Sequence, residues 1–311
     1  MERVRIAIAH RGAGLSPVFA AIEGGFFRAE GIEPEMVPLH GHPRALAALQ
    51  AGEVEFTNSV GAELILANLR HGGDAVVIAS AISRSAQQVS ARPGVTSLAQ
   101  LRGARWGVTA RGDADECAIV MAFERWGWDP ARDAEMVVVG SDGARLDLLL
   151  DARRVDAAIM HAPEPFQAAR RGWTLVEDLA RLDVAAQNSC AATTRRMLNG
   201  KPDLVLRYVR AFCAGVHRFR TDPEFGIGVL RRYGSETDAG ILRDTWVLFA
   251  RLMGGMMYPS LEGMRGAADL LHRVGAAPRL ARAEEFVAME PVAALERERF
   301  FDRLLGAEAI A

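Results

Sequence analysis

The chain of 311 residues has few cysteines and a single lysine. The three cysteines, Cys117, Cys190 and Cys213, are odd in number and far apart in the sequence. This usage argues against a framework of disulfides and against a zinc site built from cysteines alone. Lys201 follows Asn199-Gly200, a turn sequence. An enzyme that forms a Schiff base with its substrate or with pyridoxal phosphate would have to use this turn lysine, so that class fits poorly.

The sequence also lacks an excess of charge and any long apolar segment. The formal net charge is -2, which offers no basic face and predicts no nucleic-acid partner. No apolar run approaches the roughly 18–20 residues of a membrane span, so we expect no membrane insertion. Residues 1–5 lead directly into an apolar strand pattern, without the features of a secretory signal. We therefore expect a cytoplasmic protein as the chain stands, or a periplasmic one if a signal has been removed.

The first part of the chain alternates between strand and helix patterns. Short runs rich in Val, Ile and Ala predict strands at residues 3–9, 35–39, 56–59 and 75–82. Between them, apolar residues at helical spacing predict helices at residues 18–23, 44–51 and 62–70. Alternation of this kind indicates a parallel sheet covered by helices.

The same pattern then starts again. Strands are predicted at residues 105–109, 135–139 and 157–161, and helices at 97–103, 114–126, 141–151 and 164–171. After residue 200 the chain is almost entirely helical, with helices predicted at residues 202–222, 223–233, 238–253 and 261–274. We interpret this as an α/β protein of two lobes, each a mainly parallel sheet flanked by helices. Residues 1–89 begin lobe 1, residues 90–188 form lobe 2, and residues 189–311 return to lobe 1 with C-terminal helices packed on it. The predicted crossings lie near residues 89–93 and 184–189.

Several stretches resemble, in order, a known group of proteins. They are residues 16–27 (SPVFAAIEGGFF), 49–56 (LQAGEVEF), 97–103 (SLAQLRG), 105–108 (RWGV), 151–159 (DARRVDAAI) and 258–263 (YPSLEG). They are similar to the aliphatic-sulfonate, taurine and thiamine-precursor branch of the type II periplasmic binding proteins. The resemblance implies a two-lobed clamshell that closes on a small organic molecule, with an ABC importer permease as the partner of most members and no cofactor. The chain is expected to be a monomer or a dimer.

The same resemblance keeps an enzymatic alternative open. A minority of relatives on this scaffold are enzymes: a thiamine pyrimidine synthase, a desulfinase and an aromatic decarboxylase. In that case His10, His40 and His161 are the candidate catalytic acids or bases of a lyase or synthase. Arg70-His71-Gly72-Gly73 resembles a short motif of the desulfinase branch, but Phe27 stands in the region where the cysteine nucleophile of that branch would lie. Cysteine-based sulfinate chemistry is therefore a poor fit.

Histidines follow three predicted strands, where ligands of parallel sheets bind. They are His10, His40 and His161, and His42 lies two residues beyond the second of them. With Glu164, these imidazoles suit a divalent metal such as zinc or iron. Alternatively, they hydrogen-bond a carboxylate or sulfonate and titrate near neutral pH. The spacing matches no recognised metal motif, so no metal site and no cofactor are assigned.

The two helices that face the predicted cleft differ in charge at their starts. Ser16-Pro17 is expected to cap the first helix and, with Arg11, to receive an anionic group. Asp113, with Asp115 and Glu116, neutralises the start of the second helix and disfavours a further anion there. We therefore expect an asymmetric ligand, acidic or polar towards lobe 1 and neutral or cationic towards lobe 2. The remaining candidate ligand-binding residues lie at strand ends and crossings: Ser59, Arg84, Gln88 and Asn188.

Overall fold

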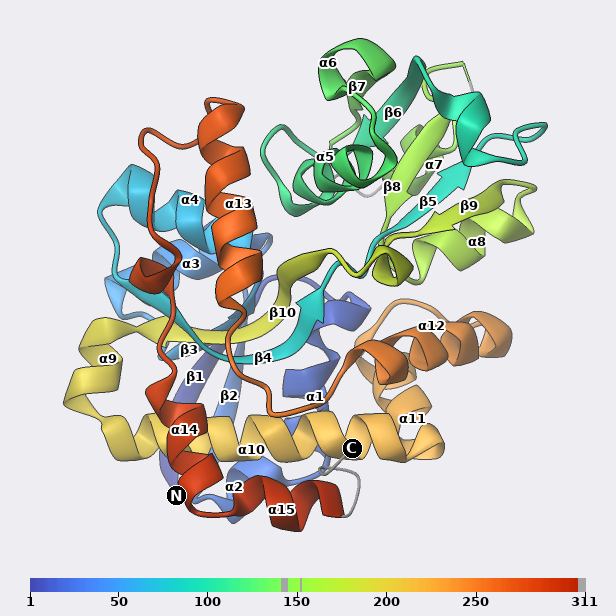
Figure 1. Cartoon of the computed structure of the whole chain (residues 1–311). Coiled ribbons are helices and arrows are strands. Elements are labelled where there is room, and N and C mark those ends of the chain that lie inside the picture. The colour runs from blue at the N-terminus through green and yellow to red at the C-terminus, as the bar shows by residue number, and fades with distance from the viewer. Residues whose placement is uncertain (141–144, 152, 307–311) are drawn as a thin grey trace.

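The computed structural model describes residues 1–140, 145–151 and 153–306, and its strands form two sheets of five (Figure 1). The first sheet has the order β2-β1-β3-β10-β4. Its strands are β1 (Glu2–Ile8), β2 (Ile32–Pro38), β3 (Phe56–Ser59), β4 (Ala75–Arg84) and β10 (Ala185–Thr194). β1 pairs in parallel with β2 and β3, whereas β10 lies antiparallel between β3 and β4. This sheet is the centre of lobe 1.

The second sheet, the centre of lobe 2, repeats this plan in the order β7-β6-β8-β5-β9. Its strands are β5 (Gln88–Ala91), β6 (Ala104–Val108), β7 (Ala134–Val138), β8 (Ala157–Met160) and β9 (Thr174–Asp178). β6 pairs in parallel with β7 and β8, and β5 lies antiparallel between β8 and β9. Each lobe thus contains one strand that is antiparallel to the rest, β10 in lobe 1 and β5 in lobe 2. Each is the first strand after the chain crosses over from the opposite lobe. The mainly parallel, two-lobed α/β fold expected from the sequence is confirmed.

The chain changes sheet earlier at both crossings than the sequence suggested. It leaves β4 at Arg84 and begins β5 at Gln88, and it leaves β9 at Asp178 and begins β10 at Ala185. Residues 89–91 and 185–189, expected in connections, are thus strand residues. Backbone pairing with β8, β9 and β4 forms these strands, and β10 accommodates its crossing through register shifts between Ala185 and Cys190. The boundaries drawn at residues 89/90 and 188/189 stay predictions.

Helices cover both sheets. Those of lobe 1 before the first crossing are α1 (Ser16–Glu23), α2 (Phe26–Ala29), α3 (His42–Ala51) and α4 (Gly61–His71). Those of lobe 2 are α5 (Ala114–Trp126), α6 (Pro130–Asp133), α7 (Arg145–Leu149) and α8 (Glu164–Arg170). The predicted helix at residues 141–151 overlaps α7, and its residues 141–144 lie outside the described residues.

The C-terminal part of the chain is helical and packs on lobe 1, as Figure 1 shows. Its helices are α9 (Arg195–Gly200), α10 (Pro202–Thr221), α11 (Pro223–Tyr233), α12 (Ala239–Leu252), α13 (Leu261–Arg273), α14 (Glu290–Arg297) and α15 (Phe300–Leu305). α10 contacts α1 and α2, and α13 contacts α4 and β10. Among the described residues, no helix is both long and apolar enough to span a membrane.

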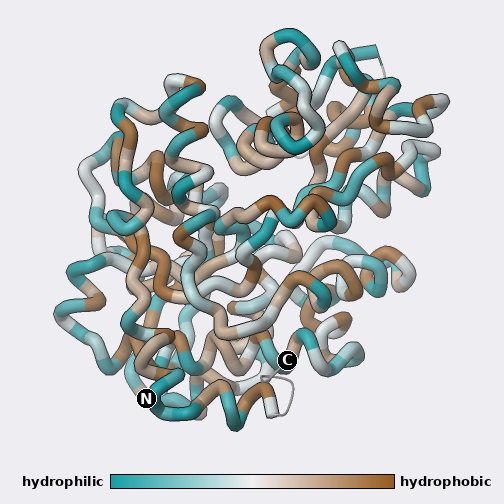
Figure 2. Tube along the Cα trace, viewed as in Figure 1, coloured by the Kyte–Doolittle hydropathy of each residue, from teal (hydrophilic) through white to brown (hydrophobic). Residues whose placement is uncertain are grey.

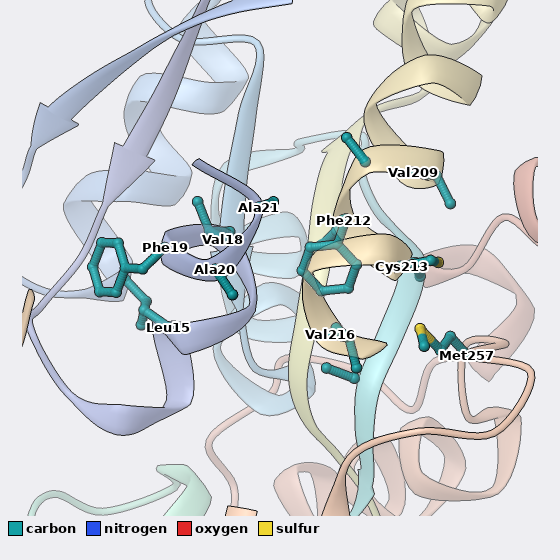
Figure 3. Packing of buried hydrophobic residues seen from close by; sticks show 14 of the residues in the cluster. Leu15, Val18, Phe19, Ala20, Ala21, Val209, Phe212, Cys213, Val216 and Met257 are labelled. Carbon is teal, nitrogen blue, oxygen red and sulfur yellow. The ribbon is translucent and has the colours of Figure 1, made fainter. Parts of the chain in front are cut away.

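The packing of α1 against α10 anchors the lobe 1 core (Figure 3). Val18 of α1 and Phe212 and Val216 of α10 are fully buried. Gly215 lets the two helices approach closely, because a Cβ atom there would lie 2.6 Å from the backbone N of Ala21. Hydrophobic and hydrophilic residues alternate along the helices of lobe 1 in Figure 2, as expected for helices with one buried side.

The two lobes contact each other through polar side chains on two sides. On one side, Arg273 of α13 forms an ion pair with Glu124 of α5 at 2.7 Å. On the other, Arg251 of α12 pairs at 2.7 Å with Asp178 at the end of β9. These two ion pairs join side chains of lobe 1 to side chains of lobe 2.

Candidate ligand-binding site between the lobes

Histidines from both lobes approach one another where the lobes meet. His10 follows β1, and His42 is the first residue of α3, so both belong to lobe 1. Their rings meet edge to face, with centroids 5.1 Å apart and an interplanar angle of 84°. His161 follows β8 in lobe 2 and interacts electrostatically with both of them. Two of the three strand-end histidines, His10 and His161, thus lie in the same region as His42.

The two lobe 1 histidines are held in the neutral form. Desolvation by the surrounding protein lowers the pKa of His10 to about 4 although the residue is exposed at the surface, and His161 makes a smaller contribution. Burial lowers the pKa of His42 to about 3, with smaller contributions from His10 and His161. Nδ1 of His10 accepts a hydrogen bond from the backbone N–H of Gly12 at 2.8 Å, which places the ring proton on Nε2. At neutral pH these rings therefore act as hydrogen-bonding groups and carry no charge.

His161 is paired with a buried acid of its own lobe. Its Nε2 atom lies 2.5 Å from Oδ1 of Asp115, whose side chain is 3% exposed. Oδ2 of Asp115 accepts a hydrogen bond from the hydroxyl of Thr109 at 2.7 Å. Glu164, the first residue of α8, accepts a hydrogen bond from the backbone N–H of His161 at 3.4 Å. The residues after β8 thus form one hydrogen-bonded turn that presents the imidazole of His161.

The start of α5 is rich in carboxylates. Asp113 caps the helix, because its side chain accepts hydrogen bonds from the backbone N–H groups of Glu116 at 2.9 Å and Ala110 at 2.8 Å. Burial, and next the charge of Asp115, raise the pKa of Asp113 to about 7. Glu116 is buried and pairs with Arg111 at 2.8 Å. Asp113 is therefore the N-cap of α5, and Asp115 and Glu116 lie in its first turn, where the sequence analysis expected acids to complement the helix dipole.

Glu63 is a further candidate that the sequence analysis missed. It lies in the first turn of α4, a lobe 1 helix that contacts α5. Its Oε2 atom is buried and has no hydrogen-bond partner among the described residues. Burial, and next the charge of Asp113, raise its pKa to about 8. The signal available in the sequence was its place directly after the predicted strand at residues 56–59.

We call the following residues the interlobe cluster: His10, His42, Glu63, Asp113, Asp115 and His161. Lobe 1 contributes the first three, and lobe 2 contributes the others. Arg11 and His40 lie near this region in sequence and are exposed. No ring contact among the described residues joins His40 to the other histidines.

The expected anion site at Ser16 needs a correction. Leu15, not Ser16, occupies the N-cap position of α1, because a 3₁₀ turn (Ala13–Leu15) precedes the helix. Asn58 and Ser189 hold this turn by donating hydrogen bonds to the carbonyl of Gly14 at 3.0 and 2.6 Å. The Ser16 side chain is buried, and its hydroxyl donates to the carbonyl of Ala13 at 2.7 Å. Ser16 therefore stabilises the turn.

The other predicted ligand-binding residues have varied surroundings. Ser59 is fully buried, and its hydroxyl lies 3.4 Å from the carbonyl oxygen of Val60. Arg84 is exposed and forms an ion pair with Asp183. Asn188 donates a hydrogen bond to Oε1 of Gln87 at 3.2 Å.

Gln88 lines a separate cavity of about 360 Å³ between the β9 side of lobe 2 and α12 of lobe 1. Its side chain is buried, and Oε1 has no hydrogen-bond partner among the described residues. None of the residues of the interlobe cluster lines this cavity.

The candidate cysteine nucleophiles and the Arg70 motif find little support in the geometry. All three cysteines are buried, and burial raises the pKa of the thiols of Cys117 and Cys190. Arg70 donates to the carbonyl of Ala276 at 3.0 Å, and Phe27 lies in the lobe 1 core. Within the described part of the chain, no group of three or more His, Cys, Asp or Glu residues could hold a metal ion.

Two α/β lobes, with polar residues of both lobes facing each other at their junction, define a protein of the type II periplasmic-binding-protein class. The family described as NMT1/THI5 like matches residues 13–225, and the chain belongs to this family. No curated protein matches the chain.

Solved structures share the fold over nearly the whole chain. The putative sulfonate-binding protein SsuA of Methylobacillus flagellatus is 16% identical, with a TM-score of 0.78 over 98% of this chain and 96% of that chain. The alkanesulfonate-binding protein SsuA of Xanthomonas axonopodis pv. citri, bound to MOPS, is 15% identical, with a TM-score of 0.72 over 93% and 98%. A mutant of the desulfurization enzyme DSZB, in complex with biphenyl-2-sulfinic acid, is 16% identical, with a TM-score of 0.66 over 96% and 99%. At such identities the likeness concerns the fold, which carries both binding proteins and an enzyme.

Proposed function

We propose that the chain captures a small organic molecule between its lobes and holds it by lobe closure. The observation that carries this proposal is the interlobe cluster, in which polar groups from two sheets converge in a member of the NMT1/THI5-like family. A ligand that touches both lobes favours the closed arrangement, because its contacts with both are complete only there.

The expected ligand is polar and asymmetric. The sulfonate-binding relatives hold an anion, and the histidines of lobe 1 offer hydrogen bonds to an acidic or polar group. The carboxylates at the start of α5 favour a neutral or cationic end towards lobe 2. Delivery to the permease of an ABC importer is part of the proposal and requires that the protein work outside the cytoplasmic membrane. A protein that stays in the cytoplasm would use the same site without a permease.

An enzymatic function is the second candidate, and the contact between His161 and Asp115 is the observation that favours it. A histidine whose imidazole is held by a buried carboxylate is a common arrangement for proton transfer. In that case His161 is the general acid or base and Asp115 its positioning residue. The reaction would be of the lyase or synthase kind, as in the enzymatic relatives.

A ligand screen followed by product analysis tests both candidates. Thermal shifts are measured with aromatic acids, sulfonates, pyrimidines and amines, each with and without divalent metals. The binding proposal expects at least one compound to raise the melting temperature and to be recovered unchanged after incubation. Conversion of a bound compound into product would support the enzyme and contradict the pure binding protein. If no compound of these classes stabilises the protein, the proposal of small-molecule capture fails.

A further inference from the structure

We propose that the interlobe cluster binds a cationic N–H donor group of the ligand, an ammonium or an amidinium, between Glu63 of lobe 1 and Asp113 of lobe 2. This inference rests on the proposed function and specifies the chemistry of its ligand. It separates this chain from its sulfonate-binding structural relatives, because a sulfonate carries the opposite charge.

The two carboxylates lack a basic partner within the described residues. Asp113 accepts hydrogen bonds from two backbone N–H groups, and no arginine or lysine pairs with it. Glu63 forms no ion pair among the described residues. Apart from a hydrogen bond with its own backbone, the groups that act on it are Asp113, Asp115 and His161. Many exposed acids of this chain do have a basic partner. Glu33, for example, forms an ion pair with Arg28. The two acids act on each other electrostatically, and when they ionise they give this part of the junction a negative potential.

Two buried atoms independently point to a ligand that donates hydrogen bonds. Oε2 of Glu63 and Nδ1 of His42 are buried and have no partner among the described residues. They come from different helices, α4 and α3, and both side chains interact with His161. A buried polar atom is normally hydrogen-bonded, so each of these two atoms is a place where a ligand can supply the missing partner. The carboxylate oxygen accepts a hydrogen bond, as does the neutral imidazole nitrogen when its proton is on Nε2, and an ammonium or amidinium supplies several N–H donors.

When no ligand is bound, protons on Glu63 and Asp113 neutralise the two acids. The raised pKa values of Glu63 and Asp113, about 8 and about 7, mean that both acids hold protons close to neutral pH. A cationic ligand would displace these protons and leave the acids ionised and paired. An anionic ligand would face whichever acid remained charged, and this is the physical basis of the predicted selectivity.

Three probe molecules of similar shape but different charge test the inference on the full chain. Benzamidine, benzamide and benzoate carry about one positive charge, none and one negative charge at neutral pH. Their binding is measured by calorimetry in the presence of EDTA, which removes trace metals. We expect benzamidine to bind at least about tenfold more tightly than benzamide, and benzoate to bind weakest.

Variants connect this preference to the cluster. Glu63→Gln and Asp113→Asn should each remove the preference for benzamidine over benzamide. Asparagine is also a good N-cap residue, so the second variant keeps the start of α5 intact if the first fails to fold. The matched control is Glu262→Gln, because Glu262 is an exposed acid in the first turn of α13 in lobe 1. It should keep the full preference.

The outcomes separate this inference from the proposed function. Tighter binding of benzoate, or an unchanged preference in both cluster variants, would overturn the inference. If none of the three probes binds while a sulfonate or an aromatic acid does, the inference fails and the proposed function stands. If no compound of any charge binds, both fail. Stabilisation by zinc alone, without a response to benzamidine, would also overturn the inference in favour of a metal.

Discussion

Nε2 of His161 lies 2.5 Å from Oδ1 of Asp115, and both residues belong to lobe 2. Asp115 fixes the imidazole from within lobe 2, while His10 and His42 of lobe 1 interact with it electrostatically. Glu63 does so from a different helix of lobe 1. His161 is therefore a side chain of lobe 2 that interacts with three side chains of lobe 1.

The stability of the ligand-free protein should depend on the charge of Glu63. An acid with a raised pKa holds its proton more tightly in the folded protein, so stability falls as pH rises from about 4.3, the unfolded value, to about 8. Glu63→Gln carries no charge and avoids this loss. We expect the variant to be more stable than the wild type by about 1 kcal/mol or more above pH 8, and similar to it near pH 4. Urea unfolding at both pH values measures this, and a variant that is less stable at high pH would contradict the burial of Glu63.

Asp156 should stabilise lobe 2 at neutral pH and lose this effect in acid, the opposite of the pH dependence expected for Glu63. Its carboxylate accepts hydrogen bonds from Nε of Arg105 at 3.0 Å and Nε of Arg92 at 2.9 Å. The hydrogen bond from Arg105 is the largest cause that lowers its pKa to about 2. A lowered pKa gives stability that is present above pH about 3.9 and is lost as pH falls through about 2.

We therefore expect Asp156→Asn to lose about 1–2 kcal/mol at pH 7 and progressively less below pH 4. Unfolding followed by circular dichroism checks the size and the pH profile. Glu33→Gln removes an exposed partner of Arg28 and serves as the control, with no measurable change expected. An equal loss in both variants would show that burial of the Asp156 pair contributes nothing.

Gly215 should be intolerant of a side chain. An added Cβ would lie 2.6 Å from the backbone N of Ala21, so α10 would have to move away from α1. We expect Gly215→Ala to destabilise lobe 1 by about 1–3 kcal/mol. Gly228 of α11 has no atom within 4 Å of the same position and is exposed, so Gly228→Ala should stabilise its helix slightly. Melting temperatures measure both effects. A shift in the same direction for the two variants would contradict this packing.

The fold followed from the sequence where local patterns were strong. The helix at residues 114–126 and the strand at residues 56–59 are observed with the same bounds. β5 and β10 were missed as strands because their identity comes from pairing with distant strands, and β10 consists mainly of small and polar residues. Local propensity does not report such pairing.

The sequence predicted only some residues of the candidate site, because the site also depends on contacts between distant parts of the chain. The rule that ligands lie beyond strand ends singled out His10 and His161, which the structure brings into one region. It also singled out His40, which makes no ring contact with the other histidines among the described residues. Glu63 looks in sequence like an ordinary acid in a first helical turn, and only the contact between α4 and α5 brings it close enough to Asp113 to interact electrostatically. Sequence therefore indicates which residues reach the junction of the lobes, whereas the tertiary arrangement decides which of them face one another.

The binding of a screened ligand by His161→Ala, compared with the wild type by calorimetry, tests the interlobe site most directly. Because His161 interacts electrostatically with histidines of lobe 1 and is held by Asp115, its removal should weaken binding by about tenfold or more while the lobes remain folded. A variant that binds the same ligand with unchanged affinity would contradict the assignment of the site.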